Sequence, residues 1–237
     1  MEEDIFRFKQ FNVNQAGCTM KINTDGVLLA VKANQDHHVG HILDIGTGTG
    51  VMALMLAQRY PDAYVESIDI DEGAVFCAEE NFKNSPFASR LAVHHIGIED
   101  YQTTVSYDLI VSNPPFFINS LKNPDKRKSL SRHGSTKFYK FLFNKCSALL
   151  SADGSFQIIW PMEIRDQTLS LSLSAHLYLN NEVYISSFPD SAPFRVISTF
   201  KKRPPDSYVS KNFNIYKEEK VYSEQYKELL KPFFINY

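Results

Sequence analysis

His41-Ile42-Leu43-Asp44-Ile45-Gly46-Thr47-Gly48-Thr49-Gly50 decides the fold of this 237-residue chain. Its apolar first half predicts a buried strand, and its glycines at alternate positions predict a turn into a helix. Glycine allows a tight backbone turn there and lets a ligand approach the main chain closely. Taken alone, this pattern fits a dinucleotide site, a phosphate-binding loop or a purely structural turn.

The spacing of the glycines separates these alternatives. No Gly-Lys-Ser or Gly-Lys-Thr follows, so the loop lacks the lysine that a phosphate-binding P-loop needs. A dinucleotide fingerprint has its third glycine three positions after the second, whereas Gly48 and Gly50 are two positions apart. The carboxylate of Asp44 would also repel a pyrophosphate. The loop therefore favours a ligand with a cationic amino group.

Short apolar segments alternate with helical segments after His41, which is the pattern of a parallel sheet covered by helices. We expect strands at 41–46, 63–70, 90–96, 107–112 and 154–160, a hairpin-like pair at 178–187 and 194–202, and helices at 50–59, 72–83, 138–150 and 223–230. A further helix begins near Thr24 or Asp25, either of which could cap it.

The second of these strands ends in the acids Asp69 and Asp71, about twenty residues past the glycine loop. A carboxylate in this position can hold a ribose diol with two hydrogen bonds. Asp71 directly precedes the helix expected at 72–83 and is its natural N-cap. We therefore expect Asp69 to be the ribose ligand.

The strand at 107–112 runs directly into Asn113-Pro114-Pro115-Phe116. Ligands of open α/β sheets bind beyond the carboxyl ends of the strands, and this is such an end. Two prolines supply no backbone N–H, so the corner is stiff and offers carbonyl groups and one amide side chain. Hydrogen bonds to the Asn113 amide oxygen and the Pro114 carbonyl would draw a ring amino group toward tetrahedral geometry. The lone pair of that nitrogen would then point at a methyl group on a positively charged (sulfonium) sulfur of the bound ligand. Phe116 would stack on the ring of the amine.

The composition limits the class of protein. A formal charge of −2 and a pI near 6.4 argue against a protein that coats nucleic acid through bulk positive charge. Cys18, Cys77 and Cys146 lie far apart, without disulfide-framework or zinc-ligand spacing, so we expect reduced thiols, a cytoplasmic protein and no metal site. We see neither a signal peptide nor an apolar run long enough to span a membrane.

These residues resemble a known family. Asp-x-Gly-x-Gly-x-Gly at 44–50, the acid Asp69 and Asn-Pro-Pro-Phe at 113–116 are similar to the amino-group branch of class I S-adenosylmethionine-dependent methyltransferases. The segments 6–11 and 20–29 narrow the resemblance to the bacterial tRNA adenine-N6 methyltransferases, which modify adenosine 37 beside the anticodon of a valine tRNA. The similarity extends over nearly the whole chain.

The resemblance implies an α/β, Rossmann-like class I methyltransferase fold. Its sheet would be mostly parallel and seven-stranded, with helices on both faces and an antiparallel C-terminal strand. We expect a single domain over 1–237, in which an N-terminal extension, 1–40, contributes to the cofactor site of the core, 41–237. The implied reaction transfers a methyl group from S-adenosylmethionine to N6 of the tRNA adenosine, in the cytoplasm.

The resemblance also implies the site residues. The cofactor contacts would be Thr24, Asp25, Asp44, Ile45, Gly46, Thr47, Gly48, Asp69, Ile70, Gly97, Ile98 and Asn113. The catalytic corner would be Asn113, Pro114, Pro115 and Phe116. Gly97 is a departure, because the family often has an acid there that binds the adenine amino group. Either Glu99 or Asp100 substitutes for it, or main-chain groups alone make that contact.

The most irregular stretch, 119–134, carries a group of basic residues. The candidates for contacts with RNA phosphates are Lys122, Lys126, Arg127, Lys128, Arg132 and His133. Each is equally well explained singly as an ordinary solvated charge. Further candidates of the same kind are Arg195, Lys201, Lys202, Arg203 and Lys211.

Other functions share part of these motifs. Guanine-N2 RNA methyltransferases also carry Asn-Pro-Pro-Phe and are the main competitor. Protein glutamine-N5 methyltransferases carry Asn-Pro-Pro and an aromatic residue, but they usually have a separate recognition domain, and only 43 residues precede Asp44 here. DNA adenine methyltransferases generally need an added target-recognition region. A non-catalytic cofactor-binding module would not explain the Asn113 corner.

Overall fold

The computed structural model describes residues 4–18, 20–115 and 124–236, of which 124–135 and 167 are described by their backbone alone. The strands are β1 (Ile5–Arg7), β2 (Asn12–Asn14), β3 (His41–Ile45), β4 (Tyr64–Asp69), β5 (Leu91–His95), β6 (Tyr107–Ser112), β7 (Leu150–Pro161), β8 (Tyr178–Ser186), β9 (Arg195–Lys201), β10 (Val209–Asn214), β11 (Tyr216–Glu218) and β12 (Val221–Tyr222). The helices are α1 (Thr24–Lys32), α2 (Val51–Arg59), α3 (Glu72–Lys83), α4 (Pro124–Leu149), α5 (Met162–Ser174) and α6 (Glu224–Leu230), with a 3₁₀ turn η2 (Ala88–Arg90).

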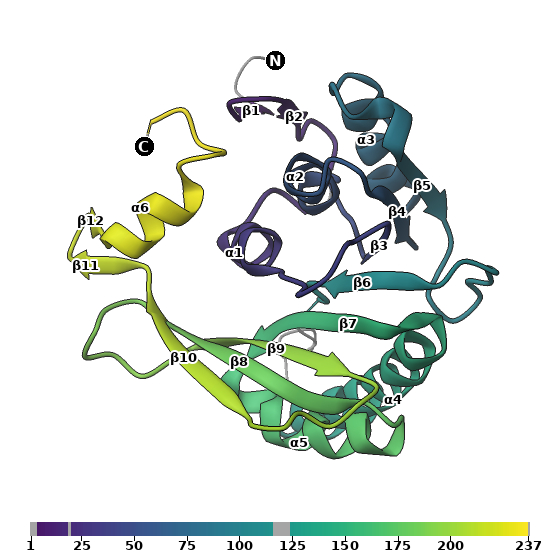
Figure 1. Cartoon of the computed structure of the whole chain (residues 1–237). Coiled ribbons are helices and arrows are strands. Elements are labelled where there is room, and N and C mark those ends of the chain that lie inside the picture. The colour runs from purple at the N-terminus through teal and green to yellow at the C-terminus, as the bar shows by residue number, and fades with distance from the viewer. Residues whose placement is uncertain (1–3, 19, 116–123, 237) are drawn as a thin grey trace.

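The central sheet has the strand order β10-β8-β9-β7-β6-β3-β4-β5 (Figure 1). Its neighbouring strands are parallel except at β9, which is antiparallel to both β7 and β8. This confirms the expected α/β, Rossmann-like class and the hairpin-like pair near the C-terminus. The sheet has eight strands rather than seven, because β10 adds a parallel edge strand. β10 is mostly exposed and polar, so it lacks the apolar signal of the other strands.

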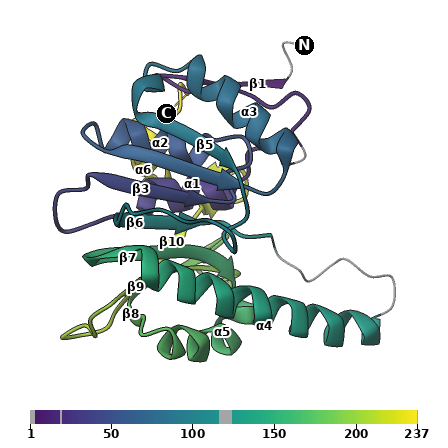
Figure 2. The same ribbon diagram turned by 90° about the vertical axis from the view of Figure 1, so that its right-hand side faces the viewer.

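Apolar side chains alternate between the two faces of the sheet. On β6, Leu109 and Val111 belong to the cluster that packs with α1 and α2, whereas Ile110 belongs to the cluster that packs with α4. Figures 1 and 2 show α1 and α2 on one side of the sheet and α4 and α5 on the other. The central strands are buried on both faces, which explains why they are continuous apolar runs in the sequence.

Two helix starts are fixed by short polar contacts. The Asn23 side chain caps α1 by accepting a hydrogen bond from Gly26 N at 2.9 Å, so the expectation that Thr24 or Asp25 caps this helix is wrong. Asp71 caps α3 as expected, through a 2.9 Å hydrogen bond from Ala74 N. Both caps satisfy backbone N–H groups that have no partner within their own helix.

Gly50 sets the start of α2. Its φ of 80° lies in the left-handed region, and a Cβ atom there would lie 2.6 Å from Cε1 of Phe82 on α3. The position therefore needs glycine both for its backbone conformation and for the close packing of α2 against α3.

The irregular stretch expected at 119–134 is wrong over 124–134, which is helical. α4 begins at Pro124, and proline is favoured in the first turn because it needs no hydrogen-bonding N–H there. Only its second half carries an apolar stripe at helical spacing, formed by Tyr139, Leu142, Phe143 and Cys146. The charged first half lacks that signal in the sequence.

Cys18 and Cys77 correct another expectation. They form a disulfide with a Cα–Cα distance of 6.3 Å, although we expected reduced thiols. The two residues are 59 positions apart and meet because the segment before α1 folds against α3. Cys146 is buried and free, as expected. The cysteine pattern therefore gives no support to a cytoplasmic location.

None of the described helices is both long and apolar enough to cross a lipid bilayer. In the same residues, no cluster of three or more histidine, cysteine, aspartate or glutamate side chains is arranged to hold a metal ion.

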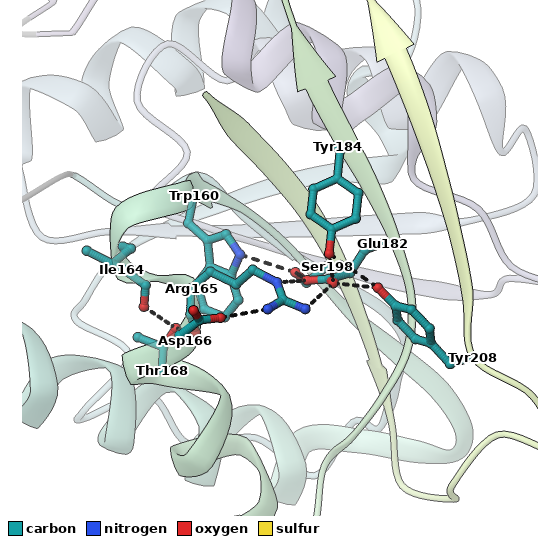
Figure 3. Close-up of polar contacts among 9 residues, drawn as sticks. All are labelled: Trp160, Ile164, Arg165, Asp166, Thr168, Glu182, Tyr184, Ser198 and Tyr208. Carbon is teal, nitrogen blue, oxygen red and sulfur yellow. Dashed lines mark hydrogen bonds and ion pairs between the residues drawn. The ribbon is translucent and has the colours of Figure 1, made fainter. Parts of the chain in front are cut away.

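A buried polar network joins α5 to β8 and β9 (Figure 3). The Glu182 carboxylate accepts hydrogen bonds from Arg165 Nε at 2.8 Å, Arg165 Nη2 at 2.5 Å and Ser198 Oγ at 2.8 Å. The hydroxyl groups of Tyr184 and Tyr208 donate to the same carboxylate at 2.9 and 2.7 Å. Burial raises the pKa of Glu182, but these hydrogen bonds outweigh burial and hold it below its usual value. Glu182 is therefore a paired charge at neutral pH.

Arg165→Met should lower the free energy of unfolding by about 3–5 kcal/mol at pH 7, because it leaves a buried carboxylate without its bidentate partner. The matched control is Asp166→Ala, which removes the exposed partner of the same guanidinium and should change stability little. Since the pKa of Glu182 is lowered on folding, the stabilisation by this pair should be lost as the pH falls below about 4.5. Urea unfolding of the three proteins measures this, and equal stability of Arg165→Met and wild type would contradict it.

Candidate active site

The turns that follow β3, β4 and β6 meet at one edge of the sheet, because these strands are parallel and in register. Ile45, the last residue of β3, is opposite Ile68 of β4 and Ser112 of β6. The chain proceeds from β3 outward to β4 and β5 and then returns to the other side of β3 as β6. The order therefore reverses between β3 and β6, which is where open α/β sheets bind their ligands.

A cavity of about 400 Å³ lies at this edge, a size typical of small-molecule sites. The expected residues that line it are Ile45, Gly46, Thr47, Gly48, Asp69, Ile70, Gly97, Ile98, Asn113, Pro114 and Pro115. Thr24, Asp25 and Asp44 do not line it. The segment before α1 contributes Met20, Lys21, Ile22 and Asn23, and α4 contributes Phe138.

The remaining expected residues lie where the structure is not described. Phe116 and Lys122 fall outside the described residues. Lys126, Arg127, Lys128, Arg132 and His133 are on the first half of α4, whose backbone alone is described.

Asp69 is fixed by the main chain on both sides. Its Oδ2 accepts a hydrogen bond from Gly48 N at 2.9 Å, and its Oδ1 accepts one from Asp71 N at 3.0 Å. Each carboxylate oxygen has a second lone pair, so the side chain can still accept two hydrogen bonds from a diol. Gly48 has a φ of 56°, and it is this left-handed conformation that presents its N–H to Asp69.

Asp44 lies beneath the glycine loop and is fully buried. Its Oδ2 accepts a 2.7 Å hydrogen bond from Thr47 Oγ1, and its Oδ1 has no partner in the described part of the chain. Burial raises the pKa of Asp44 to about 7, with a contribution from the Asp69 charge and against the lowering effects of the Thr47 hydroxyl and the Ala53 main chain. A buried carboxyl with one unpaired oxygen is unusual, and it would be stabilised by a nearby cation.

Asn113 is oriented by Asn23. The Asn113 Nδ2 group donates to Asn23 Oδ1 at 3.2 Å, and the same oxygen accepts from Gly26 N as the cap of α1. Asn113 Oδ1 accepts no hydrogen bond from the described residues, so it is available to a ligand. The Ser112 hydroxyl donates to Ile45 O at 3.0 Å and holds the end of β6 against β3. Asn23 is not among the residues expected from the sequence, although an asparagine directly before Thr24 is a recognisable cap.

Asp25 forms an ion pair with a residue distant in the sequence. Its Oδ2 accepts from Arg195 Nε at 2.8 Å, in an ion pair that joins α1 to the first residue of β9. Its carboxylate is therefore engaged outside the cavity. Arg195, which we considered as a phosphate contact, is the other member of this pair.

Gly97 lines the cavity at the position where the resemblance implies an acid. Added to Gly97, a Cβ atom would come within 3.1 Å of both Glu99 Oε2 and Ile70 Cγ2. Glu99 lines the cavity and Asp100 does not, so Glu99 is the acid that occupies this region. Ile70 and Ile98 give the same part of the cavity apolar walls, which suit a planar ring.

Comparisons with known proteins find similar sequences among methyltransferases. A family model described as the methyltransferase small domain matches residues 18–181. The tRNA1(Val) (adenine(37)-N6)-methyltransferase of Pedobacter heparinus is 43% identical over 98% of this chain and 99% of its own length. The chain belongs to this methyltransferase family. The protein of the same name from Parabacteroides distasonis is 38% identical over 99% of both chains. The resemblance inferred from the sequence is confirmed.

Solved structures show that the fold of this family member is shared by other methyltransferases. A predicted O-methyltransferase from Agrobacterium tumefaciens has a TM-score of 0.67 and 14% identity, covering 88% of this chain and 96% of its own. The N-methyltransferase NodS from Bradyrhizobium japonicum, in complex with S-adenosyl-L-homocysteine, has a TM-score of 0.51 and 16% identity, covering 75% of this chain and 83% of its own. At these identities the likeness concerns the fold.

Proposed function

We propose that the chain transfers a methyl group from S-adenosylmethionine to the exocyclic N6 of adenosine 37 in a valine tRNA. The observation that carries this proposal is the Asn113 corner: Asn113, Pro114 and Pro115 line the cavity, and the Asn113 amide nitrogen is held by Asn23. The full-length similarity to proteins named for this reaction supports the choice of adenine over guanine and over a protein glutamine.

The cavity suits S-adenosylmethionine, which supplies a methyl group on a sulfonium sulfur. We propose that Asp69 accepts hydrogen bonds from the ribose hydroxyls, and that Ile70 and Ile98 enclose the adenine ring of the cofactor. Glu99 is the candidate partner for the adenine amino group. We propose that Asp44, which is buried beneath the glycine loop and does not line the cavity, attracts the cationic amino group at the other end of the cofactor through its charge.

Asn113 acts on the attacking amine by orientation. Asn113 Oδ1 and the Pro114 carbonyl oxygen accept hydrogen bonds from the two N–H groups of the adenine amine. The nitrogen lone pair is therefore directed toward the methyl group instead of into the ring. An amide is not a base at neutral pH, so Asn113 does not take the proton that the amine loses. The contact is strongest when the nitrogen becomes tetrahedral, which lowers the barrier more than it tightens binding.

An anticodon loop offers unpaired bases that can be splayed into such a cavity. We propose that Phe116 stacks on the base. The basic residues Lys122, Lys126, Arg127, Lys128, Arg132 and His133 remain proposed contacts to the RNA phosphates. We also place the reaction in the cytoplasm, on the ground that its substrate is tRNA.

We expect the affinity for the cofactor to depend on pH through Asp44. If Asp44 must be ionised to hold the cofactor, affinity for S-adenosylhomocysteine should be on the order of tenfold weaker at pH 6 than at pH 8, because a carboxyl with a pKa of about 7 is mostly protonated at the lower pH. Asp44→Asn should bind weakly with little dependence on pH. Calorimetric titration at both pH values measures this.

The ligand-free stability of the same variant is the control. A raised pKa means that ionisation of Asp44 destabilises the fold as the pH rises from about 4 to 7. Asp44→Asn should therefore melt at a higher temperature than wild type at pH 8 while binding less cofactor. A wild-type affinity that stays constant between pH 6 and pH 8 would remove Asp44 from the cofactor site.

The methylated nucleoside identifies the substrate base. Purified protein should form one N6-methyladenosine per molecule of unmodified valine tRNA, and none when adenosine 37 is replaced by guanosine. Mass spectrometry of the digested nucleosides, with cofactor carrying a labelled methyl group, measures this. N2-methylguanosine as the product would refute the proposal in favour of the guanine alternative, and no labelled nucleoside at all would refute RNA as the substrate.

A further inference from the structure

A second cavity, which we call the basic groove, has a volume of about 610 Å³. It lies between Lys32, the last residue of α1, and the strands β8, β9 and β10. Its volume falls in the range of ligand sites, about 300–1,000 Å³. The basic groove is defined by its cations, Lys32, Arg59, Lys201 and Lys211, which face the acids Asp36 and Glu182.

Some of these charges are already satisfied by the protein. Arg59 donates to carbonyl oxygens at the end of α1. Lys201 pairs with Asp36 at 3.1 Å. Glu182 is saturated by the network around Arg165. No acid that lines the groove is therefore left for the other two lysines.

Lys32 and Lys211 form no hydrogen bond or ion pair with any residue that the structure describes. The Lys32 ammonium lies 3.6 Å from the centroid of the Phe213 ring, its one close attractive contact in the described chain. Burial and the charge of Lys211 lower the pKa of Lys32 to about 8. Two like charges that line one partly buried groove would be stabilised by an anion bound between them.

We propose that the basic groove binds a phosphate group. A phosphate offers at least three strong acceptor oxygens, so it needs donors from several directions. Lys32 and Lys211 supply two charged donors, and Asn181 and Ser207 add neutral ones from β8 and from the segment before β10. A carboxylate would use fewer of these groups.

The phosphate can come from the RNA backbone or from a free phosphate ester. Binding of an RNA phosphate rests on the proposed function, whereas binding of a free phosphate ester does not. Gly26 of α1 lines the active-site cavity and Lys32 of α1 lines the basic groove, so the two sites are separated by about 9 Å of helix axis. Both sites are thus lined by residues of one helix, so an RNA substrate is the first source of phosphate to test.

The RNA arm of the test compares Lys32→Met/Lys211→Gln with Lys217→Gln. Lys217 is an exposed lysine of β11 that lines neither cavity. Fluorescence anisotropy with valine tRNA between about 50 and 200 mM salt should show, for the double variant, weaker binding and a salt slope reduced by about 0.7–0.9 for each phosphate that is no longer neutralised. The control variant should keep the wild-type slope, and both should keep wild-type affinity for S-adenosylhomocysteine.

The second arm needs no variant and no RNA. Inorganic phosphate is titrated into the wild-type protein while the Lys32 pKa is followed by NMR of ¹³C-labelled lysine. Bound phosphate should raise that pKa from about 8 toward its usual value near 10.5. Success in this arm with an unchanged RNA slope assigns the groove to a free phosphate ester. Failure of both arms overturns the proposal, whatever the outcome of the methylation assay.

Discussion

The rest of the molecule depends on the parallel pairing of β3 with strands on both of its sides. Because Ile45 is level with both Ile68 and Ser112, the glycine loop, Asp69 and Asn113 all emerge at one edge. The hydrogen bonds from Gly48 N to Asp69 and from the Ser112 hydroxyl to Ile45 then fix these turns relative to one another. A shift of one residue in either pairing would turn the buried side chains of that strand to the opposite face. The site is thus positioned by the same register that forms the core.

The two buried carboxyl groups of Glu182 and Asp44 differ in their hydrogen bonds and in the direction of their pKa shifts. Glu182 receives hydrogen bonds on both oxygens, and its pKa is lowered, as expected for a group that stabilises the fold. Asp44 has one unpaired oxygen, and its pKa is raised to about 7. A protein that retains an unsatisfied buried carboxyl beneath a ligand loop gives up stability in the free state. That is the arrangement expected of a group whose partner arrives with the ligand.

Much of this site could be predicted from the sequence, because its main features are local. Alternation of strands and helices, the glycine spacing and the placement of Asn113 after a strand each depend on a few consecutive residues. The Asp71 cap is local in the same way. With a parallel sheet assumed, these features are sufficient to bring Asp69 and Asn113 to one edge.

The rest depends on contacts between distant segments, which leave no local signal. Asp25 pairs with Arg195, and Asn23 contacts Asn113, across 170 and 90 positions. The disulfide between Cys18 and Cys77 likewise depends on how the segment before α1 packs on α3. β10 was missed for a different reason, since an exposed polar edge strand has no apolar periodicity.

The central claim is that the Asn113 corner carries the chemistry, and single-turnover methyl transfer to valine tRNA tests it most directly. With cofactor affinity and folding shown to be close to wild type, Asn113→Ala should be slower by about a hundred- to a thousandfold, the cost of removing one oriented polar interaction of about 2.7–4 kcal/mol. Asn113→Asp keeps an acceptor oxygen and should retain more activity than the alanine variant. A wild-type rate in Asn113→Ala would contradict the account.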